Sequence, residues 1–424
     1  MSFGKIAYDY GPCIDFDRLR KERLERANQM LHKHGLGSVI IYEFDNMRYC
    51  SSALGHSYWY GAQKRFISCA LLIRDAGFPY VFAGPPLTLY KKWYPWLENK
   101  LKPELGMARG HIPPQVNDFR AAMFVEQQVK PYLKDHGVSD LPVGIDLATY
   151  PLVKALQDSG LEVVNGQPAL TDARMIKTEE EIELLRLAGT MVEAAYTELV
   201  RELRPGLREN DMVAIVAKKL YEEGCDHIEG WVCCSGPRTN PNNYEPSFRM
   251  IRPGDMVFID VSGGSFAGYR TCYYRTFIVG KKPTEEQKDI YQKCLDMLNE
   301  GINALKPGIT TLEVAQKWPN WDYWGFETKE EAQEYGWIGN AIGHGIGIGG
   351  FESPIISREI LEMFPKEWLP KLEKNMVIAM ETWYGPKDGQ DGARIEDLCR
   401  ITDTGVEVLY KFPKDELIVC GEIG

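Results

Sequence analysis

The C-terminal half of the chain brings one imidazole and three carboxylates to the ends of segments that are typical of β-strands. The apolar run MVFID ends at Asp260, and the glycine-rich segment GHGIGIGGFESP carries His344. Two later segments, METWYG and GARIED, supply Glu381 and Glu396. Imidazole nitrogen and carboxylate oxygen are common ligands of divalent metal ions in proteins. These four residues therefore form a candidate metal site.

The order of these motifs resembles the creatinase, prolidase and methionine aminopeptidase family, M24, whose catalytic domain has the pita-bread fold. The resemblance implies metal ligands at these four positions and a further, metal-bridging aspartate at a position that reads Cys272 here. A two-metal clamp needs that negative charge. We therefore expect one divalent ion, Fe, Mn or Zn, with Cys272 as a soft ligand or an inert neighbour. A metal-free site is the alternative, because three crowded acids would raise at least one pKa and provide an acid and a base.

The histidines expected of a peptidase are missing. The resemblance implies two of them, for the substrate carbonyl and for the leaving amine, but one position reads Phe351 and the other falls near Asn243 or Tyr244. Amide hydrolysis needs a general acid, and imidazole is the usual one near neutral pH. Peptidase activity is therefore disfavoured.

The resemblance assigns a further residue, Glu352, to the site, because the family has a glutamate beside its second histidine. We expect Glu352 either to form a salt bridge near the pocket or to transfer a proton. In the second case it is catalytic together with His344, Glu381 and Glu396.

Substrate-binding candidates are Arg394 and two aromatic clusters. Arg394 would share a strand face with Glu396 and orient either that carboxylate or an acidic group of the substrate. The segments GHSYWYGAQKR, with Trp59 and Tyr60, and KWPNWDYWGF, with Trp324, suit either an aromatic box for a cation or packing and dimer contacts. In metal-free creatinase a loop at the position of SYWYGAQKR reaches the partner subunit's active site, so the resemblance implies a homodimer.

Within the family, SGPRTNP and the spacing from Asp260 to Cys272 most resemble the branch that contains the dimethylsulfoniopropionate lyases, which cleave a C–S bond in a sulfonium zwitterion. Acids of that branch fall here on Ser262 and on Gly349 or Gly350. We expect a lyase or hydrolase that cleaves a C–S or C–N bond of a small cationic or zwitterionic molecule. The alternatives are an Xaa-Pro peptidase-like metallohydrolase and a non-catalytic pita-bread binding module.

Periodicity along the 424 residues predicts two domains: an α/β creatinase-like domain over 1–170 and a pita-bread catalytic domain over 171–424. A charged amphipathic helix is expected from Asp15 to His34, and Thr178, followed by three glutamates, is expected to cap a long helix. LRPG and LKPG, starting at Leu203 and Leu305, and MVFID and MVIAME form a weak internal repeat. The repeat predicts two similar halves around one pocket.

Composition limits the functional classes. The net charge is −11, and no basic stripe is present to follow a phosphate backbone, so nucleic-acid binding is disfavoured. No apolar run is long enough to span a bilayer and the N-terminus has charges where a signal peptide needs apolar residues, so a cytoplasmic protein is expected, without a membrane partner. The ten cysteines lack any C-x-x-C pair and are expected to be reduced and mostly buried.

Overall fold

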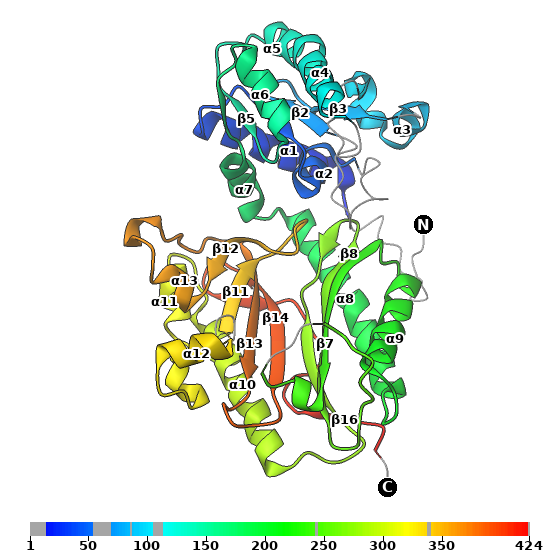
Figure 1. Cartoon of the computed structure of the whole chain (residues 1–424), viewed down its shortest axis with the longest axis vertical. Helices are drawn as coiled ribbons and strands as arrows, with labels where there is room; N and C mark the ends of the chain where they lie inside the picture. Colours follow the sequence, from blue (N-terminus) through cyan, green and yellow to red (C-terminus); the bar gives the residue numbers. More distant parts are fainter. Residues whose placement is uncertain are drawn as a thin grey trace. The chain divides into compact units, whose positions relative to one another are not determined.

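The computed structural model describes residues 14–53, 69–84, 87–104, 113–241, 245–336 and 341–422. The chain forms two compact units, one over Asp15–Arg174 and one that includes Met175–Gly424 (Figure 1). Each unit has its own sheets and its own core.

The N-terminal unit contains a mixed six-stranded sheet with the order β4-β3-β2-β1-β5-β6. Strands β1 to β3 are antiparallel neighbours, whereas β4, β5 and β6 each pair in parallel. The strands are β1 (Ser38–Ile41), β2 (Cys69–Ile73), β3 (Tyr80–Ala83), β4 (Leu101–Pro103), β5 (Val143–Ile145) and β6 (Val163–Asn165). The helices are α1 (Phe16–Lys33), α2 (Phe44–Ser51), α3 (Leu87–Trp93), η2 (Pro95–Lys100), α4 (Pro114–Phe124), η3 (Val125–Val129), α5 (Lys130–Asp135), α6 (Tyr150–Asp158) and α7 (Gln167–Met175).

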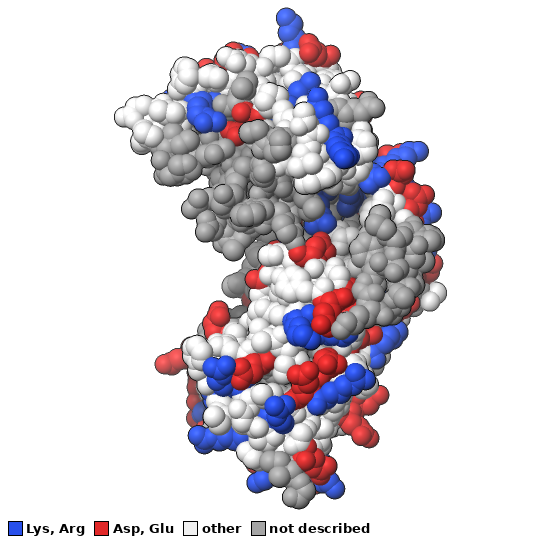
Figure 2. Space-filling view, turned by 90° about the vertical axis from the view of Figure 1, so that its right-hand side faces the viewer, with Lys and Arg blue, Asp and Glu red and all other residues white. Residues whose placement is uncertain are grey.

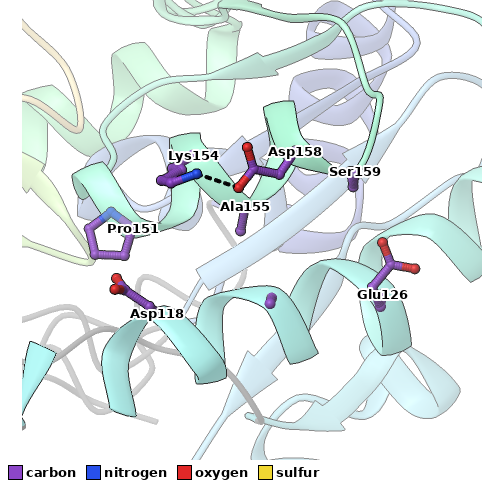
Figure 3. A pocket seen from close by; sticks show the side chains of 8 residues that line it. Asp118, Glu126, Pro151, Lys154, Ala155, Asp158 and Ser159 are labelled. Atoms are coloured by element: carbon purple, nitrogen blue, oxygen red, sulfur yellow. Dashed lines mark hydrogen bonds and ion pairs between the residues drawn. The ribbon is translucent and has the colours of Figure 1, made fainter. Parts of the chain in front are cut away.

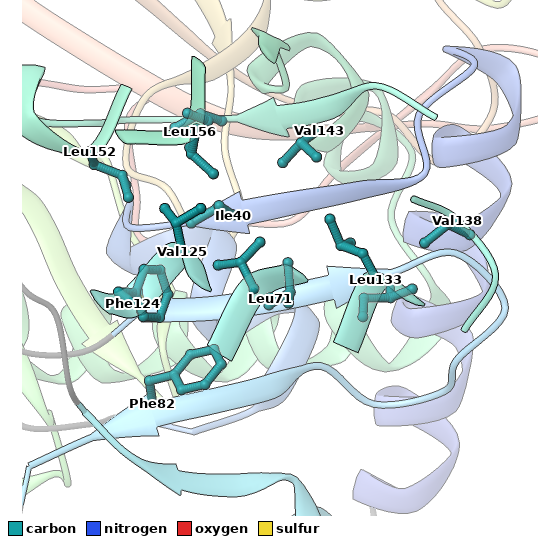
Figure 4. Packing of buried hydrophobic residues seen from close by; sticks show 14 residues of the cluster. Ile40, Leu71, Phe82, Phe124, Val125, Leu133, Val138, Val143, Leu152 and Leu156 are labelled. Atoms are coloured by element: carbon teal, nitrogen blue, oxygen red, sulfur yellow. The ribbon is translucent and has the colours of Figure 1, made fainter. Parts of the chain in front are cut away.

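The core of this unit lies between the sheet and the helices from α4 to α6. Figure 4 shows Ile40, Leu71 and Phe82 of neighbouring strands packed against Phe124 and Leu133, all with at most 1% of their surface exposed. Burying such side chains supplies roughly 1.5–3 kcal/mol each. The predicted helix from Asp15 is confirmed, because α1 begins at Phe16 and the Asp15 side chain accepts hydrogen bonds from two of its first N–H groups.

Two five-stranded sheets form the framework of the C-terminal unit, the one that includes Met175–Gly424. The first has the order β16-β10-β8-β7, with β9 paired to β8, and the second has the order β12-β11-β13-β14-β15. The first consists of β7 (His227–Ser235), β8 (Met256–Phe266), β9 (Tyr269–Arg270), β10 (Tyr274–Val279) and β16 (Ile418–Cys420). The second consists of β11 (Ala341–Gly345), β12 (Glu352–Ile356), β13 (Val377–Tyr384), β14 (Ala393–Ile401) and β15 (Val406–Val408).

Helices cover the two sheets separately: α8 and α9 pack on β8 and β7, and α10 packs on β13 and β14 (Figure 1). The helices of this unit are α8 (Glu179–Glu202), α9 (Glu209–Glu222), η4 (Gly236–Arg238), α10 (Glu285–Ala304), α11 (Thr311–Ala315), η5 (Trp321–Trp324), α12 (Lys329–Tyr335), α13 (Arg358–Leu361) and η6 (Lys366–Trp368). As predicted, Thr178 caps α8, in a capping box with Glu181.

The internal repeat of the sequence corresponds to a repeat of structure. Leu203 ends α8 with φ −67° and ψ 120°, and Leu305 ends α10 with φ −68° and ψ 119°. MVFID lies on β8, and MVIAME lies on β13. The two sheets meet where β10 lies beside β14, since the Thr276 hydroxyl donates to the carbonyl oxygen of Arg394 at 2.7 Å and accepts from its N–H at 2.9 Å. The two halves therefore bring β8 and β13 to one central region.

Figure 2 shows acidic and basic side chains interspersed over the displayed face of the C-terminal unit. Within the described residues, no helix combines the length and the apolar character that crossing a membrane requires. The cysteines in the same ranges are all buried free thiols, as predicted.

Candidate functional site

Asp260 comes from the first sheet, and Cys272 lies in the short connection between its strands β9 and β10. Asp260 lies on β8, opposite Val232 of β7 and Tyr274 of β10. Its Oδ1 accepts the backbone N–H of Tyr273 at 2.7 Å, and the Cys272 Sγ lies 3.9 Å from its Oδ2. Burial, together with the charge of nearby Glu381, raises the pKa of the Asp260 carboxyl to about 7. The bond from Tyr273 opposes this shift but does not cancel it.

His344, Glu381 and Glu396 come from the second sheet and share one of its faces. Glu381 of β13 is directly opposite Glu396 of β14 and Ile342 of β11. Residues opposite each other point to the same face of a sheet, and so do residues two apart on one strand. His344, two residues after Ile342, therefore stands on the face of the two glutamates.

The imidazole of His344 is held with one nitrogen available to a ligand. Its Nδ1 lies 2.9 Å from the carbonyl oxygen of Gly345, and a carbonyl only accepts, so Nδ1 carries the proton. Burial lowers the pKa of His344, which favours the neutral ring. The lone pair is then on Nε2, which lies 4.0 Å from Glu396 Oε1.

Glu396 is fully buried, and its two carboxylate oxygens differ in their hydrogen bonding. Its Oε2 accepts the N–H of Tyr274 at 3.2 Å, whereas Oε1 has no hydrogen-bond partner within the described part of the chain. Burial raises the pKa of this carboxyl well above its usual value, and the charges of Glu381 and Asp260 raise it further. Arg275 anchors β14, because its guanidinium donates to the backbone carbonyl of Glu396 and to the side chain of Asp397.

Sulfur, nitrogen and oxygen donors converge at this point. One ligand atom each from Cys272, His344 and Glu396 lie within 4.8 Å of one another, and all three residues are buried. A buried carboxylate oxygen without a partner is costly, and a bound cation would remove that cost. The donor set therefore fits a divalent metal ion.

Glu381 is bound by Arg394. The Nη2 of Arg394 lies 2.6 Å from Glu381 Oε2, and its guanidinium carbon lies 4.2 Å from the centre of the Tyr274 ring. The sequence predicted that Arg394 orients Glu396 or a substrate acid; the structure instead pairs it with Glu381 of the adjacent strand.

Glu352 forms a buried salt bridge, one of the two roles expected for it. Its Oε2 accepts the Nζ of Lys177 at 2.9 Å, and its Oε1 accepts the N–H of Gly349 at 2.7 Å. The side chains of Lys177 and Glu352 are only 1% and 3% exposed. The pair thereby ties the glycine-rich segment after His344 to the start of α8. Lys177 was missed by the sequence analysis, because nothing around it indicates a partner 175 residues away.

Phe351 occupies the position of the first expected peptidase histidine. Its ring stacks on the imidazole of His344, with the centroids 4.1 Å apart and the planes inclined by 22°. Phe351 is 61% exposed, so its other parts face solvent. The second expected position, at 243 or 244, lies outside the described residues, as do Trp59 and Tyr60.

Trp324 is 1% exposed and packs against Tyr323 and Tyr384, with ring centroids 5.5 Å and 6.0 Å away. This is the packing role that the sequence analysis kept as an alternative to an aromatic box.

A separate hollow of about 220 Å³ lies between α4 and α6 of the N-terminal unit (Figure 3). Its lining includes Asp118, Glu126 and the ion pair of Lys154 with Asp158. It contains none of the candidate site residues.

Comparison with known proteins agrees with this geometry. The sequence profile of metallopeptidase family M24 matches residues 183–403, which is just over half of the chain. The chain belongs to this family. A dimethylsulfoniopropionate lyase, DddP, of Roseovarius nubinhibens is 24% identical over 430 residues, which cover 99% of this chain and 92% of the lyase. An Xaa-Pro dipeptidase of Pyrococcus furiosus is 31% identical over 253 residues, which cover 58% of this chain and 66% of the dipeptidase.

Among solved structures, an Xaa-Pro dipeptidase from Bacillus anthracis superposes with a TM-score of 0.71 at 22% identity, over 94% of this chain and 99% of its own. An X-Pro aminopeptidase from Thermotoga maritima gives a TM-score of 0.68 at 20% identity, over 93% and 99% of the two chains. The predicted M24 membership and pita-bread fold are therefore confirmed.

Proposed function

We propose that this chain is a non-peptidase member of the M24 family that cleaves a C–S or C–N bond of a small cationic or zwitterionic molecule. The observation that carries the proposal is the Phe351 ring stacked on His344, where a peptidase of this family would have an imidazole. A phenyl ring transfers no proton, and an amine leaving group needs one. The similarity to a lyase over 99% of this chain also supports a non-peptidase function.

An onium substrate removes the need for that proton. When a sulfonium or quaternary ammonium group leaves, the electron pair of the broken bond stays on sulfur or nitrogen, and the product is a neutral sulfide or amine. In an elimination, a base takes the proton next to the substrate carboxylate, and the electron pair left on carbon forms the double bond. A site with carboxylates and without a second imidazole suits this reaction.

Glu381 is the base in this proposal. Arg394 binds its Oε2 at 2.6 Å and thereby fixes the direction of the carboxylate. Cys272, His344 and Glu396 would hold one divalent ion, with the Asp260 carboxylate beside them, and the ion would polarise a substrate carboxylate or activate water when it is bound. Glu352, engaged by Lys177, positions the glycine-rich segment beside His344.

A second candidate is Xaa-Pro dipeptidase activity, which the 31% identical relative favours.

To distinguish the two functions, the metal-loaded protein is incubated with sulfonium and quaternary ammonium carboxylic acids and with Xaa-Pro dipeptides, and the products are identified by NMR. An unsaturated acid with free sulfide or amine indicates elimination, and a hydroxy acid indicates hydrolysis. Cleavage of the dipeptides alone would remove the proposal. Sedimentation analysis tests the expected homodimer separately.

A further inference from the structure

Cys272 gives this site a donor that differs in kind from the bridging aspartate that the family resemblance implies. A carboxylate offers two oxygens and so can bind two cations at once, whereas Cys272 offers one sulfur. That sulfur belongs to a compact buried group with a His344 nitrogen and a Glu396 oxygen, all within 4.8 Å of one another. The group contains one imidazole, one thiol and one carboxylate.

The spacing of these donors fits a single ion. With metal bonds of about 2.0–2.3 Å, ligand atoms around one tetrahedral ion stand roughly 3.3–3.6 Å apart. Nε2 of His344 lies 4.0 Å from Oε1 of Glu396. A movement of a few tenths of an ångström would bring this pair to ligand spacing.

Two independent observations indicate that Cys272, His344 and Glu396 are arranged to bind a metal ion. Glu396 Oε1 is buried and has no hydrogen-bond partner in the described ranges, although the residue is 0% exposed. The Nδ1 of His344 is bound to the Gly345 carbonyl, which is the arrangement that usually orients a metal-binding imidazole through its other nitrogen.

We propose that Cys272 is a thiolate ligand of a single thiophilic divalent ion of the zinc type, bound together with His344 and Glu396. Three protein ligands with a remaining position for water or substrate is the usual composition of a catalytic zinc site. Thiolate favours Zn²⁺, Co²⁺ and Cd²⁺ over Mn²⁺ and Mg²⁺. This assignment rests on the proposed function only in treating the site as metal-binding.

Binding of the ion converts the Cys272 thiol to a thiolate, and the proton passes to the buffer. The carboxylate of Asp260 stands beside the sulfur, and its negative charge adds to the attraction for the cation. Glu381 keeps its bond to Arg394 and contributes no ligand in this arrangement.

The test uses metal-free full-length protein titrated with Co²⁺, followed by absorption spectroscopy and by calorimetry. We expect one equivalent of Co²⁺ to bind and to produce a sulfur-to-cobalt charge-transfer band in the near ultraviolet. Cys272→Ser should lose the band and lower the affinity by more than about 100-fold, because removing a ligand costs more than removing its support. Cys225→Ser is the matched control, since Cys225 is 7% exposed and Cys272 is 8% exposed.

Two results would overturn the assignment: binding of two equivalents without a charge-transfer band in the unaltered protein, or a band that persists in Cys272→Ser. The wild-type titration is decisive even where a variant does not fold. A thiolate band in a protein that cleaves no onium compound would leave the metal site standing and remove the proposed substrate class. Onium cleavage without a thiolate band would remove the proposed metal site and leave the proposed substrate class standing.

Discussion

Breaking the ion pair between Lys177 and Glu352 tests what Glu352 does. In Lys177→Met the carboxylate loses the ammonium that binds it while its surroundings stay dry, since the pair is 1% and 3% exposed. Removing one partner of such a buried pair costs about 3–5 kcal/mol. For a unit of about 250 residues, roughly 2–4 °C per kcal/mol converts this into a fall in melting temperature of about 6–20 °C.

The assay is a double-mutant cycle by thermal unfolding. Glu352→Leu alone should destabilise the C-terminal unit similarly, because it removes the carboxylate that binds the buried Lys177 ammonium. The double variant should lose less than the sum of the two, by at least about 2 kcal/mol, because no unpaired charge remains. Exposed Lys374, paired with Asp403 at 2.7 Å, provides the control, since Lys374→Met should cost at most about 1 kcal/mol.

A proton-transfer role for Glu352 predicts the opposite pattern. In that case Glu352→Gln would abolish turnover while leaving the melting temperature within about 2 °C of the wild type, a change of under about 1 kcal/mol. Additive effects of the two substitutions in the cycle would also refute the structural role.

Three further predictions concern the site and the N-terminal unit. His344→Ala and Glu381→Gln should each lower turnover of the true substrate by at least about 100-fold, with circular dichroism unchanged; near wild-type activity in either would show that the site is assigned wrongly. Cys272→Asp should raise occupancy toward two ions in elemental analysis and still lower activity, and unchanged occupancy would mean that position 272 does not face the ligands. Burial raises the pKa of Glu43 from its ordinary 4.5 to about 7, so between these pH values the folded chain holds a proton that the unfolded chain has lost. The stability of the N-terminal unit, measured by hydrogen exchange of β1 amides, should therefore fall as pH rises through this range. Glu43→Gln should flatten this pH dependence.

Local sequence signals predicted much of the fold. Asp15 and Thr178 each bind the N–H groups of the helix that follows, and such caps depend only on neighbours within three residues. The segments CALLI and YVFA form the antiparallel strands β2 and β3. Strand β1 ends at Ile41, two residues before Glu43, which caps α2 by accepting the N–H of Asn46.

The site was only partly predictable, because its pairings depend on strand register. Sequence motifs marked the site residues: Asp260, His344, Glu381 and Glu396 lie on β8, β11, β13 and β14, and Cys272 lies between β9 and β10. The partner of Arg394 depends on how β13 and β14 align: Trp383 lies opposite Arg394, which places Glu381 diagonally within reach. No local pattern contains that alignment.

The most direct measurement of the central claim compares two activities in one preparation of metal-loaded protein. The specificity constant, kcat/KM, is determined for a small sulfonium or quaternary ammonium acid and for an Xaa-Pro dipeptide. Because Phe351 stands at one of the two positions where the family resemblance implies a catalytic imidazole, a contribution of about 10²–10⁴-fold is missing for the dipeptide. We predict that the constant for the onium acid exceeds that for the dipeptide by at least about 100-fold. Equal constants, or a preference for the dipeptide, would contradict the account.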